Sequence, residues 1–218
     1  NYSVVDWLLE LKKTLSQIEL KNKIPILVGG SGLYINAVIN GLVNIPLISE
    51  TIKNQSLIKF NEVGIEKFRQ INFQIDPRFM QNNNDKHRLL RAYGIFLQTK
   101  KNISFWYQQP RVKTVNKNIY SFFITSERKS IYKKCEIRFE DMLAKGAIYE
   151  VKKLHNSNID RSLPISKSLG VKWLLSYLDN NISYEEAVKL SKRDTRRYVK
   201  RQFTWFAHNY IPYKIINV

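Results

Sequence analysis

The feature that most constrains the fold of this chain is a short apolar run that ends at two glycines. Residues 24–28 read IPILV, Gly29 and Gly30 follow, and Ser31 precedes a stretch whose apolar residues have helical spacing. Such a run before a glycine turn is typical of a strand buried on both faces of a parallel sheet, and Ser31 is expected to cap the following helix. Because glycines allow close backbone approach and a helix N-terminus attracts anions, the turn is a candidate phosphate contact. A plain strand-to-helix turn is the alternative.

Length and composition indicate a globular protein of the reducing cytoplasm. The 218 residues are 44% hydrophobic, which is enough for a core with an insertion. The single cysteine, Cys135, excludes an internal disulfide, and no Cys/His cluster has zinc spacing. The apolar runs are too short to span a membrane, and no charged-then-apolar leader opens the sequence, so we expect no membrane contact.

The net charge of +18 is unevenly distributed along the chain. Residues 1–50 hold four lysines and four acidic residues, so the whole excess lies beyond them. This placement predicts a polyanionic partner for the later part of the chain. The alternative is that abundant Lys, Asn and Ile reflect base composition.

The expected elements are mostly helices. Residues 2–20 have a helical period. Residues 46–114 show helical stretches without strand-like runs, with a short element beginning at Asp76-Pro77 and a turn at residues 82–84 before the cap Asp85. Residues 119–125 are rich in β-formers and predict a strand.

A further helix is expected to begin after a cap at Ser126 and to stop at Gly146. Its apolar stripe would consist of Ile131, Cys135, Phe139 and Met142. A short helix over residues 147–155 follows.

The last helix is strongly basic. Ser183 and Glu186 predict a capping box at its start. Two rows of basic residues at a spacing of four dominate the exposed face predicted for residues 189–201: Lys192, Arg196, Lys200 and Arg193, Arg197, Arg201. Like charges at this spacing repel each other unless an anion relieves them, although a charge run is also typical of a solvated face. Asp194 is the one acidic residue in these rows.

Four segments, in order, resemble the tRNA dimethylallyltransferase (tRNA isopentenyltransferase) family. They are VGGSGLY (28–34), NDKHRLLRA (84–92), SKSLGVK (166–172) and TRRYVKRQFTWF (195–206). The last is similar to the family signature TRxYAKRQxTWF. The chain departs from the family pattern at Ser31 for Thr, Lys86 for Pro, His87 for Gln, Lys100 for Gly, Leu169 and Val171 for Ile and Tyr, and Asp194 for a small residue.

The resemblance implies an α/β fold: an incomplete parallel-sheet core like that of P-loop NTPases, with an all-helical insertion domain. The implied domains are 1–47 and 115–218 for the core, the latter with the long basic helix, and 48–114 for a tRNA-contacting insertion. The implied reaction of this prenyltransferase is transfer of a dimethylallyl group from its diphosphate to N6 of the adenosine 3′-adjacent to the anticodon. Magnesium is the implied cofactor, and the anticodon stem-loop and dimethylallyl diphosphate are the implied partners.

The resemblance also implies roles for individual residues. Ser31 and Arg138 would act in catalysis, and Gly29, Gly30 and Arg138 would hold the diphosphate. For Arg138, a surface arginine paired with Glu140 or Asp141 is the alternative, and for Lys53 it is an ordinary solvated lysine. The implied tRNA contacts are Lys53, His87, Arg88, Leu89, Leu90, Arg91, Lys167, Gly170, Arg193, Arg196, Arg197, Lys200 and Arg201.

The family's phosphate-binding loop has no counterpart in these 218 residues, because no GxxxxGK[ST] sequence occurs. That loop, the magnesium ligands and the general base are expected in sequence upstream of residue 1 or in a separate N-terminal polypeptide. The chain alone is therefore expected to be inactive. A non-catalytic RNA-binding protein and a fragment related to P-loop nucleotide kinases are the alternative functions.

Overall fold

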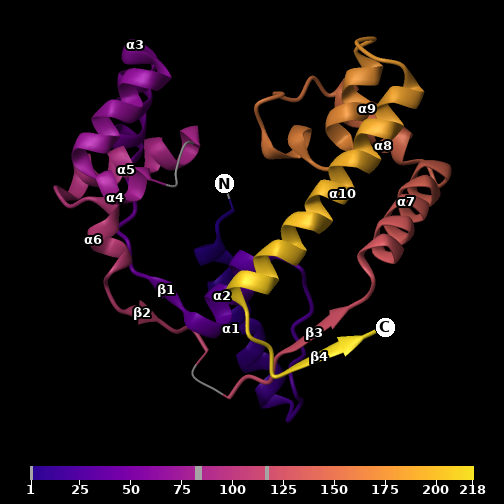
Figure 1. Ribbon diagram of the computed structural model, residues 1–218, viewed down its shortest axis with the longest axis horizontal. Coiled ribbons are helices and arrows are strands. Elements are labelled where there is room, and N and C mark those ends of the chain that lie inside the picture. The colour runs from indigo at the N-terminus through magenta and orange to yellow at the C-terminus, as the bar shows by residue number, and fades with distance from the viewer. Residues whose placement is uncertain (1, 82–84, 116–117) are drawn as a thin grey trace. The chain divides into compact units, whose positions relative to one another are not determined.

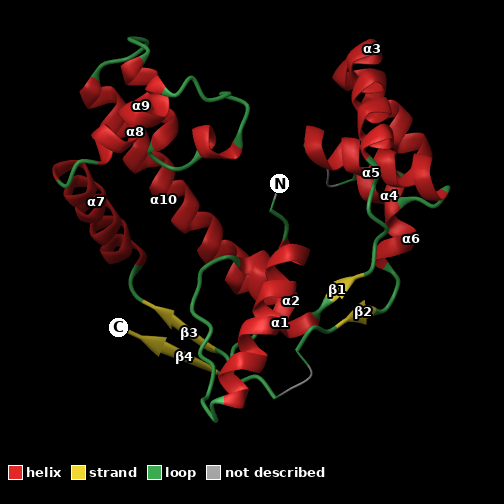
Figure 2. Cartoon of the chain, turned by 180° about the vertical axis from the view of Figure 1, so that it is seen from behind, coloured by secondary structure: helices red, strands yellow, loops and turns green. Residues whose placement is uncertain are grey.

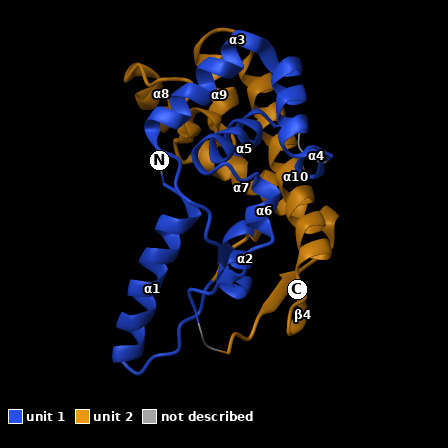
Figure 3. Cartoon of the chain, turned by 90° about the vertical axis from the view of Figure 1, so that its left-hand side faces the viewer, with its two compact units in different colours: residues 1–27, 33–117 blue, residues 28–32, 118–218 orange. Residues whose placement is uncertain are grey.

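A computed structural model describes residues 2–81, 85–115 and 118–218. The turn predicted at residues 82–84 lies outside the described residues. The chain forms two compact units, one of residues 1–27 and 33–117 and the other of residues 28–32 and 118–218 (Figure 3). Helices predominate in both, and the described strands are short (Figure 2). No described helix is long and apolar enough to cross a membrane.

The first unit begins with two packed helices. α1 (Val4–Leu20) has a capping box, in which Ser3 and Asp6 each accept a hydrogen bond from the other's backbone N–H. α2 (Gly32–Asn40) packs against it through Ala37 and Val38, and the rings of Trp7 and Tyr34 stack 4.7 Å apart. The helix predicted over residues 2–20 is confirmed.

The buried strand predicted at residues 24–28 is wrong. These residues form no regular element, and Ile24, Ile26 and Val28 are 89%, 84% and 88% exposed. A strand needs a neighbour that accepts and donates its backbone hydrogen bonds, and no described residue pairs with this segment. The apolar composition is therefore not accompanied by burial.

A helical subdomain forms the rest of the first unit (Figure 1). Its helices are α3 (Glu50–Ile75), α4 (Pro77–Met80), α5 (Lys86–Thr99) and α6 (Ile103–Tyr107), around a core that includes Phe68, Leu89, Ile95 and Ile103. β1 (Leu42–Val43) pairs antiparallel with β2 (Arg111–Val112), so the expectation of no strand within residues 46–114 is wrong at its end. Two residues are too few to give a period, which is why β2 escapes a sequence pattern.

Asp76 ties three parts of this subdomain together. The residue is 3% exposed, and its carboxylate accepts hydrogen bonds from the backbone N–H of Phe79 at 3.0 Å and from the backbone N–H and hydroxyl of Ser104, both at 2.8 Å. Asn102 donates to the Ile75 carbonyl at 3.3 Å. The start of α4 predicted at Asp76-Pro77 is confirmed, and the same carboxylate holds the N-terminal turn of α6.

The second unit combines a parallel strand pair with five helical segments. β3 (Phe122–Thr125) and β4 (Lys214–Asn217) run in the same direction (Figure 1). The helical segments are α7 (Arg128–Ala144), α8 (Ala147–Asn156), the 3₁₀ turn η1 (Pro164–Lys167), α9 (Val171–Leu178) and α10 (Tyr184–Asn209). Val151, Leu174, Leu175 and Ala187 form the core. The strand predicted within residues 119–125 is confirmed, whereas β4 was not predicted.

α7 differs from its predicted form at two points. Its N-cap position is Glu127 and carries no side-chain cap, so the cap predicted at Ser126 is wrong. Phe139 is buried and Ile131 and Cys135 are half-buried, but Met142 is exposed and does not belong to the stripe. The stop predicted at Gly146 is confirmed, because its φ of 99° lies in the left-handed region that favours glycine.

Candidate functional site

α10 positions most of the candidate residues of the second unit. It begins where predicted: Ser183 Oγ accepts a hydrogen bond from the Glu186 backbone N–H at 3.2 Å. Because side chains four residues apart lie on one face of a helix, the two predicted basic rows are present as geometric rows. Their surroundings, however, differ.

The first basic row faces α7. Lys192 forms an ion pair with Glu140, and Arg196 forms one with Glu136, both side chains being partly buried between the helices. Acidic side chains of α7 thus relieve the charge repulsion within this row. The prediction that both rows lie on an exposed face is wrong for Lys192 and Arg196, because they pair with carboxylates of a helix more than fifty residues earlier in the sequence.

The second basic row is organised by Asp194. One carboxylate oxygen of Asp194 lies 3.3 Å from Arg193 Nε and 3.6 Å from Arg197, while the other accepts a 2.7 Å hydrogen bond from the indole N–H of Trp173 on α9. Burial raises the pKa of Asp194, but the hydrogen bonds from Trp173 and Arg193 and the nearby positive charges outweigh it and lower the pKa below its usual value. Asp194 is therefore an anchor between α9 and α10.

The C-terminal end of the rows retains exposed cations. Lys200 and Arg201 are exposed, and no described carboxylate lies within ion-pair distance of either. Arg201 lies over the ring of Tyr198 at 5.6 Å, and Arg197 is also largely exposed. We call Arg197, Lys200 and Arg201 the basic face of α10. It is the part of the rows best placed to bind an anion.

The glycine turn packs against this same part of α10. The Gly30 carbonyl accepts a hydrogen bond from the Gln202 side chain at 2.8 Å. A Cβ at Gly32 would lie 2.3 Å from the ring of Trp205, whereas one at Gly29 would meet nothing within 4 Å. Neither Gly29 nor Gly30 has a left-handed φ. Close approach of α10, and not an unusual backbone conformation, is thus the structural reason for glycine at position 32.

The other candidates for diphosphate binding are exposed. Gly29, Gly30 and Ser31 are open to solvent, and α2 begins directly after Ser31 without a recorded side-chain cap. Arg138 is exposed on α7. Neither alternative ion-pair partner holds it, because Glu140 pairs with Lys192 and Asp141 pairs with Lys145 at 2.7 Å. No recorded hydrogen bond joins Arg138 to the glycine turn within the part of the chain that the structure describes.

The candidates on α5 divide between its two faces. The helix begins at the predicted cap, where Asp85 accepts from the Arg88 backbone N–H at 3.1 Å. Leu89 is fully buried and Leu90 half-buried, so both support the helix from within. His87 is exposed beside the arginines. Arg88 and Arg91 are exposed and line a pocket of about 340 Å³ together with Phe79, Ile103 and Tyr107.

The remaining candidates are a lysine in each unit and a buried glycine. Lys53 pairs with Glu50 of its own helix at 2.5 Å. Lys167 is exposed at the end of η1. Gly170 is buried with a φ of 81°, and a Cβ there would lie 2.9 Å from the Phe139 ring. Its role in the structure is to let α9 approach α7.

Sequence reasoning assigned no binding or catalytic role to several residues that shape these sites. Asp76, Tyr107, Gln202 and Trp205 are the main ones. Gln202 and Trp205 lie in the TRRYVKRQFTWF segment, so their place in that motif was the available signal. Asp76 could be recognised only as a helix cap, because its contact with Ser104 is made across 28 residues.

Comparison with known proteins identifies the family. A family profile described as IPP transferase matches residues 1–209. The tRNA dimethylallyltransferase of Ehrlichia ruminantium is 37% identical over 210 residues, which cover 96% of this chain and 70% of that protein. The chain belongs to the tRNA dimethylallyltransferase family. The resemblance inferred from the four motifs is thereby confirmed, and the alternative of a nucleotide kinase fragment is not supported.

Further members of the family and solved structures agree. The tRNA dimethylallyltransferase of Wolbachia sp. subsp. Drosophila simulans is 38% identical over 220 residues, covering 100% of this chain and 74% of the relative. The crystal structure of a tRNA isopentenylpyrophosphate transferase from Bacillus halodurans matches with a TM-score of 0.63 at 30% identity, covering 100% of this chain and 67% of that one. A eukaryotic dimethylallyltransferase acting on tRNA gives 0.77 at 22% identity, covering 94% of this chain and 52% of that one, and shows the likeness of fold.

Proposed function

We propose that this chain contributes the RNA-binding part, and one wall of the catalytic part, of an enzyme that prenylates tRNA. The reaction is transfer of a dimethylallyl group from dimethylallyl diphosphate to N6 of the adenosine 3′-adjacent to the anticodon. The observation that carries the proposal is the Gln202–Gly30 hydrogen bond, because it joins the basic end of α10 to the glycine turn. Two family motifs, far apart in sequence, thus meet in one unit.

On the RNA side, the basic face of α10 supplies the charge. Arg197, Lys200 and Arg201 can each neutralise a phosphate, and Arg88 and Arg91 add two guanidinium groups in the other unit. Lys192 and Arg196 are already paired with acidic residues of α7 and serve mainly to hold α10 in place. A target base would leave its stack before N6 could react, as chemistry on a base requires.

On the diphosphate side, Gly29, Gly30, Ser31 and Arg138 are the residues that we assign. The exposed amides of the turn and the N-terminus of α2 favour an anion, and the Ser31 hydroxyl and the Arg138 guanidinium can donate hydrogen bonds to it. We place these residues in an α/β core of P-loop type whose phosphate loop is not among the 218 residues.

Magnesium does not fit the residues that the structure describes. No group of three or more His, Cys, Asp or Glu side chains among them could hold a metal ion. We therefore assign its ligands, like the phosphate loop, to residues that are not among these 218.

Binding to an anticodon stem-loop tests the RNA side of the proposal. About five neutralised phosphates predict that log affinity falls against log salt concentration with a slope of about −3.5 to −4.5. The double reversal Arg197→Glu/Arg201→Glu should flatten this slope by about 1.4 to 1.8, because two phosphate contacts are lost. The matched control is Lys129→Glu/Lys133→Glu on α7, which changes the same charge at the same spacing on two exposed residues.

The two double variants distinguish a dedicated surface from general positive charge. A loss of affinity and a flatter salt slope that are confined to the α10 variant support the proposal. Equal losses of affinity with equal slopes would mean that the charge of the chain acts nonspecifically, and the assignment of the basic face would be abandoned.

A further inference from the structure

The helical subdomain contains a pocket of a different character from the basic face. It has a volume of about 340 Å³, within the range of roughly 300 to 1,000 Å³ usual for ligand pockets. Phe79 of α4 and Ile103 of α6 are buried and form its apolar floor. Tyr107 of α6 is 55% exposed, and Arg88 and Arg91 of α5 complete the lining.

The walls of this pocket are held by a buried carboxylate. The Asp76 carboxylate accepts hydrogen bonds from the backbone N–H of Phe79 and from both the backbone N–H and the hydroxyl of Ser104. Phe79 lies in α4, and Ser104 follows Ile103 in α6, so one group sets the spacing between the two apolar lining residues. A pocket whose walls are fixed in advance loses little conformational entropy when a ligand binds.

The lining chemistry matches one class of ligand. A half-exposed tyrosine ring beside an apolar floor offers a surface on which a flat aromatic group can stack. Two guanidinium groups three residues apart on one helix offer hydrogen bonds and charge to a phosphate. A nucleotide carries both parts, a flat base and an adjoining phosphate.

We propose that this pocket binds one unpaired nucleotide of the RNA, separate from the adenosine that is modified. The base stacks on Tyr107 over the apolar floor, and its phosphate lies against Arg88 and Arg91. The inference rests on the proposed function for the identity of the RNA, and it adds a base-binding site within the helical subdomain. Recognition of an unstacked loop base by an aromatic side chain is a common mode of binding single-stranded RNA.

The test is a double-mutant cycle between the protein and the RNA. Each loop nucleotide of an anticodon stem-loop is replaced in turn by an abasic residue, and binding is measured to the wild-type chain, Tyr107→Ala and Tyr107→Phe. Tyr107→Ala should lower affinity about 5- to 100-fold, as expected for one stacked base, while Tyr107→Phe should retain most of the affinity. At one loop position, the abasic substitution should lower the affinity of the wild-type chain by a similar factor. The same substitution should leave the affinity of Tyr107→Ala almost unchanged.

Two controls separate stacking from general damage. Tyr149→Ala removes an exposed tyrosine on α8 that does not line the pocket and should leave affinity unchanged. Arg91→Gln should lower affinity and the salt slope, whereas Lys67→Gln on the exposed side of α3 should not. Thermal unfolding of each variant checks that the subdomain remains folded.

The outcomes separate this inference from the proposed function. If the wild type binds the stem-loop but no loop position couples to Tyr107, the nucleotide site is refuted while the proposed function stands. If the wild type does not bind the stem-loop, the proposed function fails, and the pocket is tested with adenosine 5′-monophosphate by NMR. Shift changes at α6 that disappear in Tyr107→Ala would then support a nucleotide site, and their absence in the wild type would refute it.

Discussion

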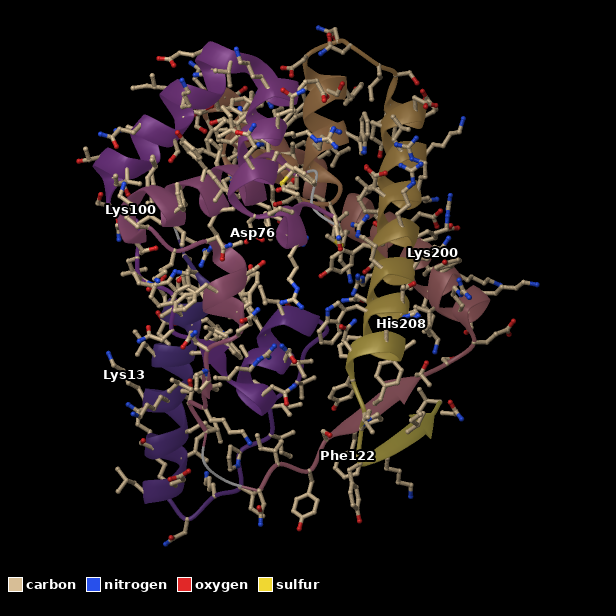
Figure 4. The ribbon with its side chains drawn as sticks, turned by 60° about the vertical axis from the view of Figure 1, so that its left-hand side comes forward. Lys13, Asp76, Lys100, Phe122, Lys200 and His208 are labelled. Carbon is tan, nitrogen blue, oxygen red and sulfur yellow. The ribbon has the colours of Figure 1, made fainter. Side chains whose placement is uncertain are left out.

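At the scale of single residues, several side chains occupy positions whose demands the structure makes explicit. Lys100 closes α5 with a φ of 57°, in the left-handed region, at the position where the family pattern has glycine (Figure 4). Asp194, where the family pattern has a small residue, joins two arginines and an indole. Both substitutions therefore have structural consequences within this chain.

We predict that Lys100→Gly stabilises the chain. The left-handed conformation strains a residue with a Cβ, and its relief outweighs the greater freedom of glycine in the unfolded chain by about 0.5 to 1 kcal/mol. Urea unfolding of the two proteins measures the difference. Lys101→Gly, one residue later and without a left-handed φ, is the control and should give no gain. An equal gain of unfolding free energy in both variants would contradict the explanation by relief of backbone strain at residue 100.

The lowered pKa of Asp194 predicts how the effect of Asp194→Asn depends on pH. A carboxyl group whose pKa is lower in the folded state contributes stability above its unfolded value, near 3.8, and loses it as the pH falls through the folded value. Asp194→Asn should therefore cost about 1 kcal/mol of unfolding free energy at pH 7, where a charge-assisted hydrogen bond is weakened. The difference from the wild type should shrink below about pH 4.

Urea unfolding at several pH values from 7 to 3 measures this dependence. The control is Asp141→Asn, whose carboxylate is half-exposed and pairs with the exposed Lys145, so the substitution should lower the unfolding free energy by less than about 0.5 kcal/mol. A cost for Asp194→Asn that did not change with pH would show that the charge of the carboxylate is not what stabilises the fold.

At the scale of elements, α10 connects the features of the second unit. Its first basic row contacts α7, its Asp194 contacts α9, and its Gln202 and Trp205 contact the glycine turn. One helix thus holds three neighbours while its remaining cations stay exposed. Substitutions on different sides of α10 should accordingly separate stability from RNA binding.

We predict that Gly32→Ala destabilises the contact between the glycine turn and α10. A Cβ at this position would lie 2.3 Å from the Trp205 ring, so the ring or the turn must move, at a cost of about 1 to 3 kcal/mol. Gly29→Ala is the matched control, because its Cβ would meet no atom within 4 Å. Thermal unfolding followed by tryptophan fluorescence compares the two. Equal stability of both variants would show that the turn does not pack as described.

At the scale of the whole molecule, only some of the elements that we assign to the proposed reaction lie within these 218 residues. The basic face, the glycine turn and the α5 arginines are present, whereas the motif GxxxxGK[ST] is absent from the sequence. The relatives extend beyond the matched region, which is 70% of the Ehrlichia ruminantium protein. Binding and catalysis should therefore be separable.

We predict that the 218-residue chain binds RNA without transferring a dimethylallyl group. No residue in it is assigned to hold the β-phosphate with magnesium or to take the proton from N6, and such elements are required for the reaction. Incubation with tRNA, magnesium and labelled dimethylallyl diphosphate measures incorporation. Clear incorporation by the chain alone would refute this assignment. A polypeptide that supplies the phosphate loop should restore turnover when it is added.

Local sequence patterns were enough to predict several helices of this protein and to identify the family to which it belongs. α5 and α10 begin at the predicted caps Asp85 and Ser183, because a side-chain oxygen three residues before an amide acts locally. The motifs that identified the family are continuous segments. A periodic pattern or a cap needs no information from distant residues, so both could be read from the order of amino acids alone.

Tertiary structure decided which of these residues are free to act. The apolar run 24–28 has the composition of a buried strand, but burial requires a neighbouring strand, and none pairs with it among the described residues. The two basic rows look equivalent in sequence, yet Glu136 and Glu140 of α7 bind one of them and Asp194 organises the other. Charge pairing depends on distances of a few ångströms between residues far apart in the chain. Only the folded arrangement therefore shows that the exposed cations of the two rows lie at the end of α10.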